Sequence, residues 1–134
     1  MTQPGRDLQR LLSDMKPLLD PQTYMFVTIP NGAAIPDSSP LMSFREAEGL
    51  TLILREADAA GLRGEFRCRR IILTVHSALD AVGFLAAVST ELATAGISAN
   101  AVAAFHHDHL FVPAARAEEA MTVLMTMADA ARLG

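Results

Sequence analysis

Apolar and polar positions alternate most clearly over residues 71–76, and the chain changes period directly afterwards. The apolar side of the alternation is rich in β-branched residues and predicts a strand, with Ile71, Leu73 and Val75 on one side. Three- and four-residue steps then predict a helix over 80–95, with Ala81, Leu85, Val88 and Leu92 on its buried face. Gly96 follows where a left-handed C-terminal cap is favoured.

The remaining C-terminal pattern predicts two strands and a second helix. The strands are expected over 97–105 and 110–112, joined by a turn at 106–108, and the helix over about 115–133. The order from residue 71 is therefore β-α-β-β-α. A right-handed crossover places both helices on one face of a mixed sheet, which is half of a ferredoxin-like sandwich.

The N-terminal part reads as α-β-β-β-α. The expected elements are a helix over 6–15, strands over 23–29, 41–45 and 49–54, and a short helix over 56–62. Prolines at 17 and 21 bracket the end of the first helix, and the Pro- and Ser-rich stretch 30–40 is a loop. Residues 65–75 read as one long strand. In a regular strand Cys68 and Ile71 point to opposite faces, so if both face one core the alternation has to be interrupted near Arg70, and a bulge there is considered.

Composition places this chain of 134 residues among folded proteins, as one domain or two small packed halves. Hydrophobic residues make up 51% and charged residues 19%, which is enough for a buried core. A net charge of −4 argues against a nucleic-acid partner held through phosphates. The one basic cluster, Arg67, Arg69 and Arg70, is divided between the two sides of a strand.

A single cysteine, Cys68, excludes an intrachain disulfide, and on a strand it reads as a small buried residue. The N-terminus lacks the pattern of a signal peptide, and no apolar run reaches the length of a membrane span. The cytoplasm is therefore the expected location, with no membrane partner.

The turn 77–83 is the first candidate for chemistry. Ser77 and Asp80 have the spacing of a capping box, and free backbone N–H groups at a helix N-terminus attract anions such as carboxylates. Gly83 lets a ligand or another backbone approach closely. The same residues also fit an ordinary capped helix start with a packing glycine, so both interpretations stay open.

The second candidate is the histidine cluster 106–109. His107 and His109 can share one face of a hairpin and bind a metal weakly, with His76 as the only other imidazole outside the cluster. Consecutive residues converge poorly on one ion, which favours a polar hairpin tip at a subunit contact.

The third candidate is Glu46 with Glu48, which is either an acid–base pair or a solvated turn. A small enzyme would have to combine these carboxylates with the histidine cluster. The sequence has no G-x-S-x-G elbow and no glycine-rich phosphate motif, so an enzyme is not expected.

Four segments together resemble one family: the stand-alone ACT-domain proteins of bacteria. They are residues 44–51, 75–84, 95–98 and 105–113, and the resemblance extends over about residues 11–127. The pattern is also similar to the ACT modules of cytosolic arginine sensors and aspartate kinases. The resemblance implies an α/β (α+β) fold of two ACT-like ferredoxin-type halves, over residues 1–64 and 65–134.

The resemblance also implies a function, a non-catalytic regulatory module that binds a small effector, typically an amino acid, without a cofactor. The effector would lie at the strand–turn–helix around 76–83, shared between halves or subunits of a homodimer. The implied contacts are Ser77, Leu79, Asp80, Val82, Gly83 and Asn100, with Glu46, Glu48 and His76 as secondary candidates. A dimerisation module without ligand and a weak metal-binding protein are the alternatives.

Overall fold

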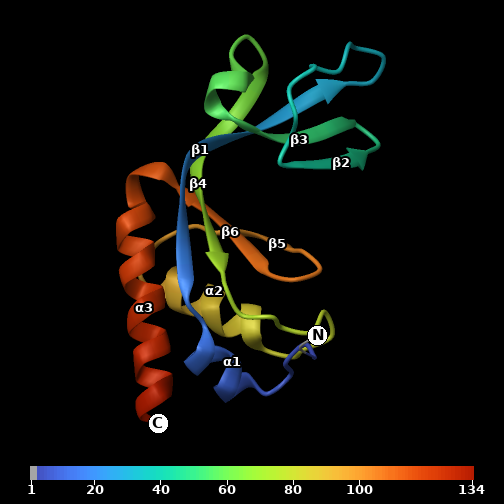
Figure 1. Ribbon diagram of the computed structural model, residues 1–134. Coiled ribbons are helices and arrows are strands. Elements are labelled where there is room, and N and C mark those ends of the chain that lie inside the picture. The colour runs from blue at the N-terminus through green and yellow to red at the C-terminus, as the bar shows by residue number, and fades with distance from the viewer. Residues whose placement is uncertain (1–2) are drawn as a thin grey trace.

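The computed structural model describes residues 3–134 as a sheet of six strands with three α-helices and two 3-10 helices (Figure 1). The elements are α1 (Leu8–Asp14), β1 (Pro17–Pro30), β2 (Met42–Glu46), β3 (Gly49–Arg55), η1 (Glu56–Ala59), β4 (Arg63–Leu73), α2 (Phe84–Thr94), β5 (Asn100–Ala103), β6 (Asp108–Pro113), η2 (Ala114–Arg116) and α3 (Ala117–Leu133). Every pairing between these strands is antiparallel. The predicted α/β (α+β) class is confirmed, and the sheet is antiparallel and not mixed.

Two long strands, β1 and β4, run through the whole sheet (Figure 1). The strand order is β2-β3-β1-β4-β6-β5. The upper group β2-β3-β1-β4 and the lower group β1-β4-β6-β5 each have the strand order of a ferredoxin-like unit, and they share the central pair. In the upper group the loop 31–41 replaces the first crossover helix, and η1 replaces the second. The division at residue 64 falls at the start of β4 and stays a prediction.

β1 begins six residues before the predicted strand, at Pro17 rather than Thr23. Residues 17–19 pair with Leu73 to Ile71, so they complete the lower group although they precede it in the sequence. Pro17 is the first residue of the strand, and Pro21 lies in an irregular stretch between Leu19 and Thr23. Both are positions where a strand tolerates proline, which is why the two prolines gave a wrong boundary.

The bulge considered near Arg70 is not on β4 itself: the interruption opposite Arg70 lies on the partner strand β1, between Leu19 and Thr23. β4 pairs with β6 in regular register from Cys68 to Leu73. Cys68 and Ile71 are both fully buried because the sheet carries apolar clusters on its two faces, one on each side of the strand. The β1–β4 register is irregular at two points. The first lies on β1 between Leu19 and Thr23, opposite Arg70, and the second has its extra residue on β4 at Phe66, whose φ is +63°.

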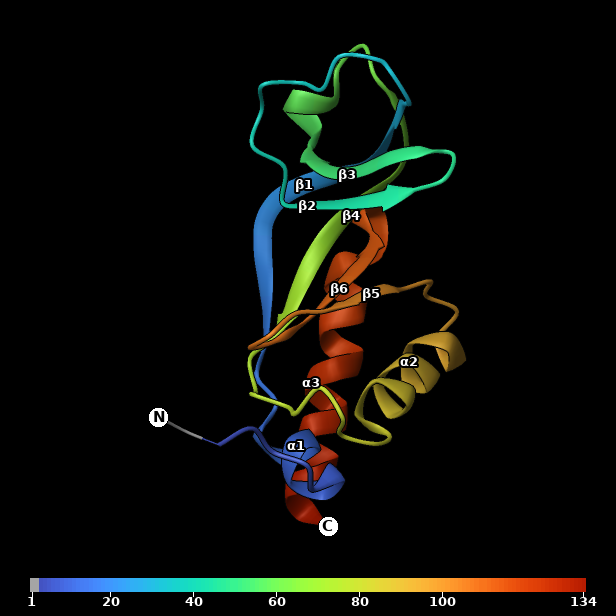
Figure 2. The same cartoon turned by 90° about the vertical axis from the view of Figure 1, so that its right-hand side faces the viewer.

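The main core lies between the lower strands and the three α-helices (Figure 2). Ile71, Leu73, Leu110 and Val112 project from β4 and β6 against the apolar faces of the helices. On the upper strands a smaller cluster packs under η1, formed by Val27, Ile29, Leu52, Leu54 and Ala59. The opposite face holds Tyr24, Ile53, Cys68 and Phe111. Burial raises the pKa of the Cys68 thiol to about 12, which makes it a structural residue and not a nucleophile.

A buried carboxylate, Asp20, joins the two central strands at the irregular stretch of β1. It accepts hydrogen bonds from the backbone N–H of Gln22 at 2.9 Å, the Tyr24 hydroxyl at 2.7 Å and Arg70 Nη2 at 2.7 Å. Burial acts to raise the pKa of Asp20, but these hydrogen bonds outweigh it and hold the pKa below 3.8. Burial and the Asp20 charge raise the pKa of Tyr24 to about 12.

We expect Asp20→Ala to lower the free energy of unfolding by about 2 kcal/mol, because it leaves Arg70 and the Tyr24 hydroxyl without their acceptor. Urea denaturation measures this change. Asp37→Ala, which removes an exposed carboxylate from the loop 31–41, is the matched control and leaves stability nearly unchanged.

The stability difference between wild type and Asp20→Ala is expected to depend on pH. The folded pKa of Asp20 is lowered, so its contribution is present above the unfolded value of 3.8 and is lost as the pH falls through the folded value. The stability difference between wild type and Asp20→Ala therefore shrinks as the pH is lowered. A difference that stays constant down to about pH 2 contradicts this assignment.

Candidate ligand site at the loop before α2

The loop 76–83 leaves the end of β4 and reaches α2, which begins at Phe84 and not at Asp80. The predicted capping box is wrong. Gly83, with φ at +95°, is the N-cap residue of α2, and no side chain caps the helix. The Ser77 hydroxyl instead donates to Asp108 Oδ2 at 3.1 Å, on β6. This bond joins the Ser77 side chain to β6, and the chain stays irregular up to Gly83.

The N-terminal segment holds the other side of this loop. The backbone N–H of Gly5 donates to the carbonyl oxygen of His76 at 2.8 Å, and the N–H of Ala78 donates to the carbonyl of Gly5 at 2.8 Å. Arg6 then forms an ion pair with Asp80, with 2.9 Å between Nη2 and Oδ1. Both side chains of this pair are largely exposed, at 63% and 75%. The loop therefore has a fixed backbone and a charge pair that is accessible to solvent.

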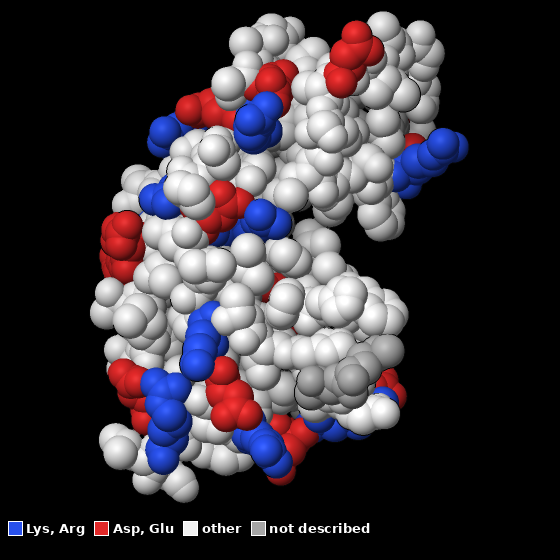
Figure 3. Space-filling model, viewed as in Figure 1, with Lys and Arg blue, Asp and Glu red and all other residues white. Residues whose placement is uncertain are grey.

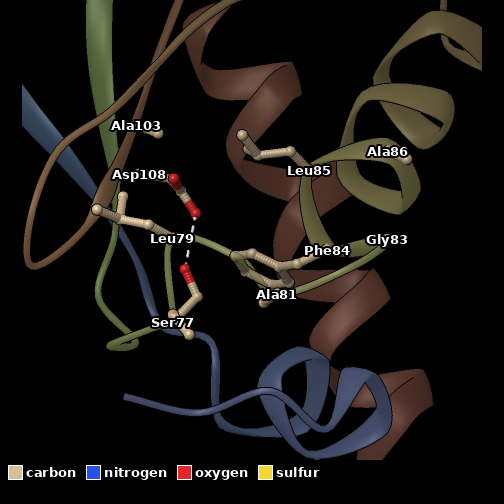
Figure 4. A pocket seen from close by; sticks show the side chains of 10 residues that line it. Ser77, Leu79, Ala81, Gly83, Phe84, Leu85, Ala86, Ala103 and Asp108 are labelled. Carbon is tan, nitrogen blue, oxygen red and sulfur yellow. Dashed lines mark hydrogen bonds between the residues drawn. The ribbon is translucent and has the colours of Figure 1, made fainter.

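A small cavity of about 120 Å³ lies between the loop, the first turn of α2 and β6 (Figure 4). Asp108 and Ser77 form its polar wall, and Leu79, Gly83 and Phe84 contribute to the rest. This volume lies below the range of about 300–1,000 Å³ that is usual for small-molecule sites. The Ser77–Asp108 bond is therefore best understood as a contact that positions the loop.

Asp108 is a residue that the sequence analysis missed in this role. It is only 6% exposed, and it lies in phase with the buried residues Leu110 and Val112 on β6. That alternation is visible in the sequence. It was overlooked because Asp108 was assigned to the turn with the histidines instead of to the strand.

A wider cavity of about 460 Å³ lies on the other side of the loop, between it and the N-terminal segment. Its volume is in the range of small-molecule sites. Arg6 and Asp80 supply one positive and one negative charge to its wall. The rest of the wall is mainly apolar or aromatic and includes Pro4, His76, Ala78, Leu79 and Phe105.

The structure brings part of the predicted site together. Ser77 and Leu79 line both cavities, Asp80 and the secondary candidate His76 line the wide one, and Gly83 lines the small one. Val82, 86% exposed, and Asn100, at the outer edge of β5, belong to neither lining within residues 3–134. Their participation stays a prediction.

Glu46 and Glu48 lie in the upper group, at the turn between β2 and β3. Both are exposed, and Glu46 accepts a hydrogen bond from the Thr51 hydroxyl. A separate hollow of about 440 Å³ next to Glu46 is also lined by Arg63 and Glu65, and it shares no residue with the cavities at the loop.

The histidines do not form a metal centre in the part of the chain that is described. Within residues 3–134 no group of three or more His, Cys, Asp or Glu side chains is arranged around one point. His109 Nδ1 lies 3.5 Å from Arg70 Nη1, and its pKa is lowered by burial and by the charge of Arg70, which also disfavours a bound cation. His106 instead packs beside Phe105, with ring centroids 4.9 Å apart, and beside His76 at 5.6 Å.

Charged side chains of both signs are interspersed over the face of the molecule in Figure 3, without a continuous basic patch. Among residues 3–134, no helix combines the length and apolarity that crossing a bilayer requires.

Models of the ACT domain match the chain over residues 4–69 and again over 65–126. The chain belongs to the ACT-domain family. ACT domains are regulatory ligand-binding modules, and the two matches overlap within β4, one of the strands that both ferredoxin-like groups share.

Solved structures of ACT-domain proteins and of uncharacterised relatives have the same fold. A protein of unknown function from Vibrio cholerae, described as a possible transport protein, is 43% identical with a TM-score of 0.80, over 90% of this chain and 95% of that one. A protein from Agrobacterium tumefaciens is 20% identical with a TM-score of 0.73, covering 85% and 89%. The regulatory subunit of aspartate kinase from Thermus thermophilus is 13% identical with a TM-score of 0.60, covering 87% and 97%. No match was found among curated proteins.

The contacts of the loop predict different effects for two substitutions. Ser77→Ala is expected to lower the free energy of unfolding by about 1–2 kcal/mol, because Asp108 loses its buried donor. Asp80→Ala is expected to cost about 0.5 kcal/mol or less, because its ion pair with Arg6 is exposed. If urea denaturation shows that both substitutions lower the free energy of unfolding substantially and equally, the capping-box interpretation is supported instead.

Proposed function

We propose that this ACT-domain protein is a non-catalytic regulatory module whose effector is an amino acid bound in the wide cavity beside the loop 76–80. The observation that carries the proposal is the Arg6–Asp80 pair at the wall of this cavity. A free amino acid has a carboxylate and an ammonium group one carbon apart. Arg6 and Asp80 present the complementary charges side by side, as such a head group requires.

The energetics of the pair support this assignment. In the free protein Arg6 and Asp80 satisfy each other at an exposed position, where an ion pair contributes little to stability. An amino acid can insert between them and replace one weak contact by two charge-assisted ones. The backbone beneath is already fixed through Gly5 and the Ser77–Asp108 bond, so little ordering is required on binding.

The module is further proposed to act as a homodimer in the cytoplasm. β2 and β5 are the edge strands of the sheet, and their unpaired backbone groups are the usual place for a second copy to add. The exposed positions of Val82 and Asn100 are consistent with contacts that form across such an interface. An effector bound at this surface favours the dimer arrangement that contacts it best, and a partner protein can recognise that arrangement.

A thermal-shift panel of the twenty amino acids, with zinc, nickel and EDTA in separate wells, tests the proposal. An amino acid present at about 100 times its Kd adds about 2.7 kcal/mol, which corresponds to several degrees in Tm. We expect one amino acid, or one chemical group of them, to give this shift. Asp80→Asn and Arg6→Met are expected to remove it, because each takes away one of the two charges.

Arg10→Met is the matched control, since Arg10 is an exposed arginine on neighbouring α1 and is not part of the cavity wall. It should leave the shift intact. A shift that survives in Asp80→Asn and disappears in Asp108→Asn places the effector in the small cavity and refutes the proposed site. If no amino acid shifts the Tm, the alternative of a dimerisation module without ligand is favoured. If only a metal ion shifts the Tm, weak metal binding by the histidine cluster is favoured.

A further inference from the structure

We infer that the wide cavity selects amino acids with a large apolar or aromatic side chain, and that Phe105 is the residue that determines this specificity. The inference rests on the proposed function, because it assumes that Arg6 and Asp80 bind the head group. It concerns the other end of the ligand, which the charge pair leaves undetermined.

The apolar part of the cavity wall explains the selection. Phe105 lies in the turn between β5 and β6, far from the loop in sequence, yet it lines the same cavity. It is 71% exposed, so most of its ring surface is available to a ligand in this cavity. Leu79, 68% exposed, lies in the same wall. A ligand side chain that covers both would remove this apolar surface from water.

Two imidazoles support the Phe105 ring in its position. Its centroid lies 4.9 Å from that of His106 and 6.5 Å from that of His76. His76 is itself held through its carbonyl by Gly5. A ring that has aromatic neighbours and is still mostly exposed can make an edge-to-face or offset contact with an aromatic ligand.

The same wall disfavours ligands with a charged or a very small side chain. Among the described residues that line the cavity, Arg6 and Asp80 are the only ones of the Lys, Arg, Asp and Glu types. Once these two bind the head group, a third ligand charge would lie against Leu79 and Phe105 without a partner, which is unfavourable. A side chain as small as that of alanine would leave most of a cavity of about 460 Å³ unfilled.

Isothermal titration calorimetry with L-phenylalanine, L-alanine, L-lysine and L-aspartate tests the inference. We expect L-phenylalanine to bind at least about tenfold more tightly than L-alanine, and the two charged amino acids to bind more weakly than L-phenylalanine. Phenethylamine and 3-phenylpropanoate, which lack the carboxylate or the ammonium group, should each bind at least about tenfold more weakly than L-phenylalanine.

Phe105→Ala is expected to reduce the preference for L-phenylalanine over L-alanine to about threefold or less. Its matched control is Phe44→Ala, since Phe44 is 64% exposed on β2 and lines no part of this cavity. Both rings are exposed, so both variants should fold, and far-UV circular dichroism checks this.

The outcomes separate the inference from the proposed function. If L-lysine, L-aspartate or L-alanine binds most tightly and Asp80→Asn abolishes that binding, the inference is wrong and the proposed function stands. If Phe105→Ala leaves the preference unchanged, or Phe44→Ala removes it, the inference is also wrong. If neither these amino acids nor the others of the thermal-shift panel bind, the proposed function itself fails.

Discussion

The antiparallel pairing of β1 with β4 is the constraint on which the rest of the structure depends. These two strands are the only ones that belong to both ferredoxin-like groups within residues 3–134, so their register fixes one group relative to the other. The register is irregular at two points, and the buried Asp20 satisfies the backbone and the Arg70 charge at one of them. A polar network therefore stabilises the place where a simple ladder of backbone bonds is interrupted.

The candidate site follows from the same pairing. Residues 17–19 at the start of β1 pair with the end of β4, and the loop 76–83 continues from there. The segment before α1 returns along this loop and contributes Arg6, while β6, paired with β4, contributes Asp108. Side chains from three distant parts of the sequence thus meet at one end of the shared strands. A ligand site that links separate segments suits regulation, because a bound effector favours the arrangement in which all of its contacts exist.

The alternating and helical periods of residues 71–133 were sufficient to predict the order of the C-terminal elements of the lower group, because the helices there bury one apolar face against the core. They were not sufficient for β1, where prolines at 17 and 21 suggest an end to structure but occupy the two positions that a strand tolerates. The burial of both Cys68 and Ile71 suggested a bulge on β4, because the sequence pattern alone does not reveal that both faces of the sheet are covered.

The residues predicted for the site divide between two cavities in the fold, and the sequence did not reveal their partners. Spacing alone gave Ser77 and Asp80 one shared role as a capping box. In the fold each finds a partner more than thirty residues away, Asp108 for Ser77 and Arg6 for Asp80, with separations of 31 and 74 residues. Contacts over such distances depend on the register of β4 with β6 and on the path of the N-terminal segment, and no local pattern encodes them.

Hydrogen–deuterium exchange with the amino acid that gives the largest thermal shift tests the central claim most directly. The account predicts slower amide exchange in residues 76–80 and in the N-terminal segment that bonds to them, with the β2–β3 turn 46–49 unchanged. Slowing confined to residues 46–49 or 106–109, with residues 76–80 unaffected, would contradict it.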